Sequence, residues 1–83
     1  MLIEYIQHAL RHPRYEIMEN GRFYGQIPEM AGTWGEGATL EECRDKLQSV
    51  LEDWLMVGFR FGDALPVIDG IDVNPQPQYA QAD

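Results

Sequence analysis

The fold of this chain is decided by residues 39–62, which read TLEECRDKLQSVLEDWLMVGFRFG. Thr39 followed by Glu42 is a capping box, in which the two side chains bind the free amides at a helix start. Glu41 and Glu42 also suit the positive end of the helix dipole. The pattern therefore predicts one long amphipathic helix that ends at Gly62. Its expected buried stripe follows alternating steps of three and four, through Leu40, Cys43, Leu47, Val50, Trp54, Val57 and Phe61, and is widened by Leu51 and Leu55.

Upstream of this helix, the chain predicts a short helix and a hairpin. Apolar residues recur at helical spacing over residues 2–11, and Pro13 ends the pattern because the residue before a proline avoids the helical region. Asn20-Gly21 predicts a tight primed turn, since such a turn needs two residues of positive φ. The two strands of this hairpin are expected over residues 14–18 and 22–27.

A third strand is expected around residues 33–36, and residues 64–68 with 71–73 could supply a fourth. The order α-β-β-β-α-β predicts an α+β fold, a small antiparallel sheet of three to four strands packed by one long and one short helix. Residues 1–73 are expected to form a single domain. Residues 74–83 are rich in proline and glutamine and are expected to form a flexible C-terminal tail.

Length and charge exclude several classes of protein. The 83 residues, 45% of them hydrophobic, suit one folded domain with a small core. Six basic and fourteen acidic residues give a net charge of −8, which opposes general binding to nucleic acid and favours basic partners. A single cysteine excludes an intrachain disulfide and fits a reducing compartment. Because neither a signal peptide nor a membrane-spanning run is recognisable, a cytoplasmic location is expected.

The sequence predicts no catalytic residues and no metal or cofactor site. Ser49 lies in the middle of the long helix without a positioned base. Cys43 lies on the apolar stripe, where a free cysteine packs as a small hydrophobe. His8 and His12 have the spacing of a helical metal-binding pair, with Glu4 one turn earlier. However, His12 directly precedes a proline, where the helix ends, so two surface histidines are the favoured interpretation.

Residues 15–43 read YEIMENGRFYGQIPEMAGTWGEGATLEEC. In order, they contain a hairpin, an Ile-Pro-acid-x-x-Gly turn, a short strand and a Gly-x-Thr-Leu-x-Glu-Cys helix start. This order and spacing resemble the HicB-like antitoxin family. The helix body continues the likeness over residues 47–55, and it extends to about Pro66.

The resemblance implies a partial RNase H-like fold and an antitoxin of a type II toxin–antitoxin pair. The implied partner is a HicA-like toxin, a small basic ribonuclease that cleaves mRNA and is blocked when the antitoxin covers its active site. An acidic chain suits this role, because opposite charge speeds encounter and fixes register. The chain resembles a short form of the family without the C-terminal DNA-binding segment, so direct nucleic-acid binding by this chain alone is not expected.

The expected partner surface is an acidic rim with two apolar residues, in which carboxylates meet basic groups and an indole is the desolvated anchor. Its residues are Glu29, Met30, Trp34, Glu36, Glu41 and Glu42. A homodimer or homotetramer is also expected, because a short chain with 11% aromatic residues tends to bury some of them between subunits.

Two alternatives stay open at this point. The chain could be an orphan structural or small-ligand-binding module of the same fold, which self-associates and has no toxin partner. It could also be an enzyme with a degenerate RNase H-like site. That reading requires Mg²⁺-dependent nuclease activity that is lost when Glu16 or Glu36 is changed.

Overall fold

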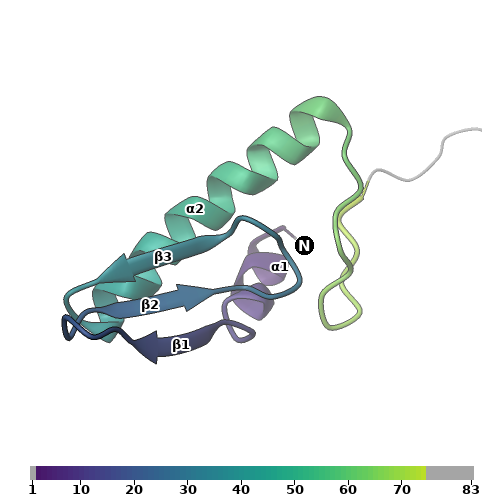
Figure 1. Ribbon diagram of the computed structural model, residues 1–83. Coiled ribbons are helices and arrows are strands. Elements are labelled where there is room, and N and C mark those ends of the chain that lie inside the picture. The colour runs from purple at the N-terminus through teal and green to yellow at the C-terminus, as the bar shows by residue number, and fades with distance from the viewer. Residues whose placement is uncertain (1, 75–83) are drawn as a thin grey trace, which may run out of the picture.

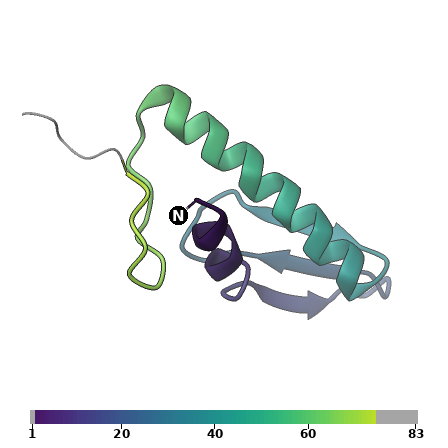
Figure 2. The same ribbon diagram turned by 180° about the vertical axis from the view of Figure 1, so that it is seen from behind.

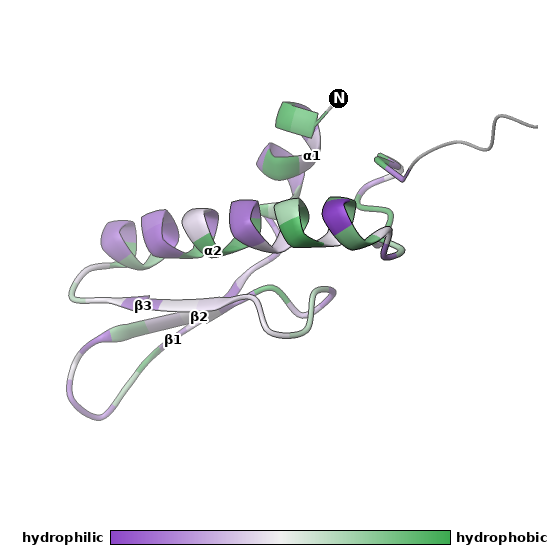
Figure 3. Cartoon of the chain, turned by 90° about the horizontal axis from the view of Figure 1, so that it is seen from above, coloured by the Kyte–Doolittle hydropathy of each residue, from purple (hydrophilic) through white to green (hydrophobic). Residues whose placement is uncertain are grey.

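The computed structural model describes residues 2–74 and has an α+β fold, as predicted. The three strands form one antiparallel sheet in the order β1 (Arg14–Ile17), β2 (Phe23–Gln26) and β3 (Trp34–Gly37). Both helices lie on the same side of this sheet, and no helix of the described residues covers the other side (Figures 1 and 3). The helices are α1 (Leu2–Ala9) and α2 (Leu40–Phe61).

The caps of α2 are built largely as the sequence predicts. The Thr39 hydroxyl accepts a hydrogen bond from the Glu42 amide at 3.1 Å. The Glu42 carboxylate accepts from the amide of Ala38 at 3.1 Å, one residue before the amide expected for a capping box. At the other end, Gly62 adopts a left-handed conformation, with φ 69°, and its amide binds carbonyls of the last turn.

We expect Thr39→Ala to lower the free energy of unfolding by about 1 kcal/mol, because the Glu42 amide loses its side-chain acceptor at the helix start. Urea denaturation monitored by circular dichroism measures the loss. Thr39→Ser keeps the acceptor oxygen and is the matched control. Equal losses in the two variants would contradict a capping role for the hydroxyl.

The buried face of α2 is shorter than the predicted stripe at both ends of the helix. From Cys43 and Leu47 the buried face continues through Leu51, Leu55 and Gly58. Leu40 is exposed at the helix start, and Val57 and Phe61 are exposed in the second half, contrary to the prediction. The reason is tertiary: the second half of α2 packs against the segment after it, where the Leu65 side chain lies against Gly58.

The first half of α2 lies very close to the sheet. Gly25, Gly35 and Gly37 occupy the sheet face that α2 covers, since side chains alternate between the two faces of a strand. A Cβ atom on Gly37 would lie 2.5 Å from the backbone nitrogen of Cys43, and one on Gly35 would lie 3.1 Å from that of Leu47. The glycines therefore set the helix-to-sheet distance.

The predicted primed turn at Asn20-Gly21 is wrong. Only Gly21 has a positive φ there, and a longer loop joins Met18 to Arg22; the Met18 amide donates to the Arg22 carbonyl across the hairpin. The reason is local: the Asn20 side chain accepts a hydrogen bond from the Arg22 amide at 2.9 Å, and this bond stabilises the longer loop.

A two-residue turn with positive φ at both positions occurs at Asp69-Gly70 instead, with φ values of 49° and 80°. Ile68 and Ile71 exchange two backbone hydrogen bonds across this turn. The segment expected to supply a fourth strand therefore forms its own small hairpin, and the sheet of the described chain keeps three strands.

The core lies between α1, α2 and the hairpin that follows α2. Tyr5 is fully buried, and its hydroxyl donates to the carbonyl of Pro66 at 2.7 Å. Asn74, expected to begin the tail, belongs to the folded part, because its side chain bonds both the amide and the carbonyl of Leu65. The rest of the expected tail, residues 75–83, lies outside the described residues. Within residues 2–74, neither helix has the length and apolar character needed to span a bilayer.

Candidate protein-binding surface

The sheet face opposite the helices carries six side chains in two rows. The strand register places Arg14, Gln26 and Trp34 across from one another, and Glu16, Tyr24 and Glu36 in the next row. Because Gly25 and Gly35 face α2, the residues beside them point to the opposite side. We call this side the open face. Its residues are Arg14, Glu16, Tyr24, Gln26, Trp34 and Glu36.

Two aromatic rings lie together on the open face. Tyr24 and Trp34 are stacked, with ring centroids 6.0 Å apart and planes at 25°. Trp34 is 52% exposed, so its indole still offers apolar area to a partner. A stacked and exposed indole is a typical anchor residue, because its position is held before binding and its area is lost to water on binding.

Two carboxylates lie beside these rings, and two more lie at the start of α2. Glu16 and Glu36 flank Tyr24 on the two neighbouring strands. Arg22 approaches Glu36, with 3.6 Å between Nε and Oε1, but both side chains are more than 40% exposed, so this pair is weak. Glu41 and Glu42 follow β3 at the start of α2 and are exposed. The carboxylates remain accessible to a basic partner.

The six residues that the sequence predicts for partner binding lie at several different places in the structure. Trp34 and Glu36 share the open face, and Glu41 and Glu42 lie at the β3–α2 junction. The prediction that Met30 lies on the partner surface is wrong. Met30 is 1% exposed and belongs to the hydrophobic core, because the loop after β2 folds back on itself.

Glu29, the sixth predicted residue, is exposed in that loop, and its carboxylate binds His12. Sequence reasoning did not assign Tyr24 to the partner surface and considered Glu16 only for a nuclease site, whereas the structure brings both onto the open face. Strand alternation alone places Tyr24 on the same side of β2 as Gln26. The register with β3, which is a tertiary property, was needed to place it beside Trp34.

The outer edge of β3 is unpaired in the described chain. Ile27 donates to the carbonyl of Thr33, and hydrogen-bonded pairs alternate along an antiparallel ladder. The backbone groups of Trp34 and Glu36 therefore point away from β2, toward the sheet edge. A hollow of about 460 Å³ lies beside this edge, and Lys46 and Val50 of α2 contribute to its wall. An extended segment of a partner can add to such an edge as a further strand.

His8 and His12 bind carboxylates. His8 Nδ1 lies 2.9 Å from Asp69, while His12 Nδ1 lies 2.7 Å from Glu29 and its Nε2 lies 2.9 Å from Asp69. Both ring nitrogens of His12 therefore face carboxylate oxygens, which requires the charged imidazolium. No group of three or more His, Cys, Asp or Glu residues within residues 2–74 has the arrangement of a metal site.

These contacts shift the pKa values of three groups. Hydrogen bonds to Glu29 and then Asp69 raise the pKa of His12 above its ordinary value of 6.5. The bond from His12 lowers the pKa of Glu29. The bonds from His8 and then His12 lower the pKa of Asp69. The contacts tie α1 to the loop after β2 and to the hairpin after α2, and their strength depends on pH.

We expect His12→Gln to lower the free energy of unfolding, and to lower it more at about pH 6 than at higher or lower pH. The His12 pKa is raised in the folded state, so its contribution is complete below pH 6.5 and is lost as pH rises through the folded-state value. At acid pH the stabilisation by these contacts ends for a different reason, because the pKa values of Glu29 and Asp69 are lowered in the folded state. The contribution of Glu29 is lost as pH falls below its ordinary pKa of 4.5 and through its folded-state pKa, and that of Asp69 is lost as pH falls below 3.8 in the same way. Urea unfolding of both proteins at about pH 6 and about pH 9 tests this. A histidine titration by NMR that places the pKa of His12 at or below 6.5 would contradict it.

The groups considered for catalysis are poorly arranged for it. Cys43 is fully buried, and burial raises the pKa of its thiol, which disfavours the thiolate. Ser49 is exposed on α2. Glu16 and Glu36 are two strands apart, roughly 10 Å between backbones, with Tyr24 between them. This separation does not provide the paired carboxylates of a metal-dependent nuclease.

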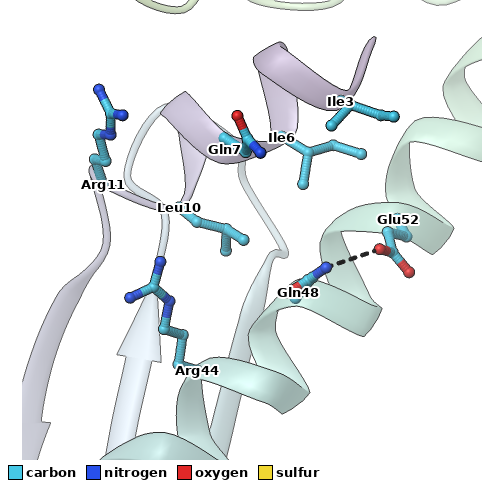
Figure 4. Close-up of a pocket in the computed structure, with 8 residues that line it drawn as sticks. All are labelled: Ile3, Ile6, Gln7, Leu10, Arg11, Arg44, Gln48 and Glu52. Carbon is cyan, nitrogen blue, oxygen red and sulfur yellow. Dashed lines mark hydrogen bonds between the residues drawn. The ribbon is translucent and has the colours of Figure 1, made fainter.

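A second hollow lies between α1 and α2 (Figure 4). It has a volume of about 600 Å³, and its lining includes Ile6, Leu10, Arg11 and Arg44. Gln48 and Glu52 on its α2 side are hydrogen-bonded to each other at 3.1 Å. If the chain binds a small ligand, this hollow is the candidate site, because it combines apolar side chains with two arginines.

Comparison with known proteins agrees with the fold. A family model described as UPF0150-like matches residues 4–66. The crystal structure of TTHA0281 from Thermus thermophilus superposes with a TM-score of 0.84 and 32% sequence identity. The match covers 92% of this chain and 95% of that one. No protein with a curated description matches the sequence.

Proposed function

Because the chain belongs to the UPF0150-like family and carries an exposed aromatic pair among carboxylates, we propose that it is an antitoxin-like inhibitor of a HicA-type ribonuclease. In this proposal it is a cytoplasmic protein that acts by binding and catalyses no reaction. The observation that carries the proposal is the stacked Tyr24–Trp34 pair on the open face, next to the unpaired edge of β3 in the described chain.

Charge supports a basic partner. A ribonuclease must attract the phosphates of its RNA, so the surface around its active site is positive. This chain has a net charge of −8, with Glu16 and Glu36 exposed on the open face and Glu41 and Glu42 exposed at the start of α2. Carboxylates that meet the basic groups of the toxin would orient the complex, while the indole of Trp34 would supply apolar contact.

Inhibition then requires only that the chain covers the active site of the toxin. With the open face or the β3 edge seated over the toxin's active site, RNA cannot reach the catalytic groups. The backbone groups of Trp34 and Glu36 can bond an extended segment of the toxin, which would fix the register of the complex. Since much of the attraction is between exposed charges, the complex should weaken as salt concentration rises.

The test begins with tagged protein bound to a resin and exposed to lysate of its own host, with elution at rising salt and mass spectrometry of the eluate. The proposal expects a small basic protein that cleaves mRNA and that loses this activity when equimolar amounts of the chain are added. Recovery of the chain alone, from a lysate in which a HicA-type protein is shown to be expressed, would contradict the proposal.

The second candidate is a self-associating or small-ligand-binding module of the same fold without a toxin. The hollow between α1 and α2 favours it, since Arg11 and Arg44 could bind the anionic group of an amphipathic ligand over an apolar floor. Arg44→Ala should abolish binding of such a ligand and leave toxin binding unchanged. The two candidates are therefore separable with one variant.

A further inference from the structure

The last two turns of α2, residues 54–61, are apolar on all sides. They read WLMVGFRF, with Arg60 as the single charged residue, whereas residues 44–53 include five charged ones. A helix that is apolar all round is normally buried. Here Met56 is 70% exposed and Phe61 is 71% exposed, and Val57 is also exposed. These two turns therefore carry a surface that the rest of residues 2–74 leaves uncovered.

The length of α2 explains this exposure. Its 22 residues extend about 33 Å, while a four-residue strand extends about 13 Å. The second half of the helix therefore extends beyond the sheet (Figure 1). α1 lies beside it (Figure 2) and adds apolar side chains next to a hollow of about 180 Å³ between the two helices. We call this surface the helical patch, formed by Leu2, Ile3, Met56, Val57, Phe59 and Phe61.

We propose that the helical patch binds the same patch on a second copy of this chain, with the two α2 helices antiparallel. Asp53 and Arg60 are seven residues apart, so they lie two turns apart on one side of α2, together with Val57. If a twofold axis passes between Met56 and Val57, Asp53 lies three positions before Met56 and Arg60 lies three positions after Val57, so the two are equally far from the axis. Asp53 of one copy then faces Arg60 of the other, and symmetry repeats the pair.

Charge favours a second copy over a basic partner at this surface. Residues 54–61 contain no carboxylate, so the patch itself lacks the groups with which the open face attracts a basic partner. Two copies that each carry −8 repel one another over most of their surface. Antiparallel contact through the helical patch pairs Asp53 with Arg60 twice and sets apolar residues around the axis.

Sedimentation equilibrium or light scattering of the full chain at micromolar concentration tests the proposal. We expect a dimer, and we expect Met56→Glu to weaken dimerisation by about 100-fold or more, because two new carboxylates would face each other near the axis. Ile17→Glu is the matched control, since Ile17 is 69% exposed on β1, and it should leave the dimer intact. Circular dichroism verifies that both variants fold.

Charge reversal tests the arrangement of the two helices. Asp53→Arg and Arg60→Asp alone should each weaken the dimer by about tenfold, since each places like charges opposite one another. The double variant should restore dimerisation, because the pair is rebuilt with its signs exchanged. A monomeric wild-type protein, a dimer that tolerates Met56→Glu, or a double variant no better than the single ones would overturn the proposal. None of these measurements involves a toxin, so they are independent of the proposed function.

Discussion

Gly37→Ala is expected to lower the free energy of unfolding by about 3 kcal/mol, the largest stability effect that we predict for a single methyl group. The new Cβ atom would lie 2.5 Å from the backbone nitrogen of Cys43 and 2.8 Å from the carbonyl carbon of Glu42. Both are backbone atoms at the start of α2, which the capping contacts of Thr39 and Glu42 hold in place. The helix must therefore shift away from the sheet as a body, and the packing beneath it is lost.

Gly58→Ala is the matched control for this prediction. Its Cβ atom would lie 2.8 Å from Leu65 Cδ2, which is the end of a flexible side chain. Alanine also favours a helix interior over glycine by about 1 kcal/mol, so the net change should be within about 1 kcal/mol. Urea denaturation of both variants measures the difference. Equal stability of the two would show that Gly37 does not set the distance between α2 and the sheet.

Trp34→Ala is expected to weaken binding of the proposed toxin by about 2 kcal/mol or more, roughly thirtyfold in Kd. The indole is stacked on Tyr24 before binding, so little conformational freedom is lost when a partner covers it. Its 52% exposure means that the same change should cost the free protein less than about 1 kcal/mol. Titration calorimetry and thermal unfolding measure the two quantities separately.

Ile17→Ala serves as the control, because this side chain is similarly exposed but lies on the other side of the sheet. It should bind the toxin as the wild type does. If Trp34→Ala binds with unchanged affinity, the toxin uses another surface and the open face loses its assigned role. If the toxin binds neither variant nor the wild type, the proposed function itself fails.

Features that depend on short-range interactions were predicted well from the sequence. The start and end of α2 follow from Thr39, Glu42 and Gly62, which act on amides and carbonyls within one turn. Pro13 limits α1 for a similarly local reason. The three strands and their antiparallel order also follow from alternation and turn residues, and the structure confirms them.

What the sequence predicted poorly depends on tertiary packing. The loop that buries Met30 has no periodic pattern, and it is folded by hydrogen bonds such as that from the Thr33 hydroxyl to the Met30 carbonyl at 2.6 Å. The buried side of α2 changes where Leu65 packs against it. Of the candidate surface, Trp34 and Glu36 were recognisable from β3 alone. The primed turn was misassigned even though an Asp-Gly pair between isoleucines marked its true place at residues 69–70.

The contact between Tyr5 and Pro66 determines when the molecule can finish folding during its synthesis. The buried hydroxyl of Tyr5 donates to a carbonyl 61 positions later, and His8 binds Asp69 at the same separation. The ribosome therefore releases α1 long before it releases the partners of these groups. During that interval the sheet and the first half of α2 can assemble from neighbouring segments, while α1 lacks its final site. The first helix to be made is thus the last to be completed.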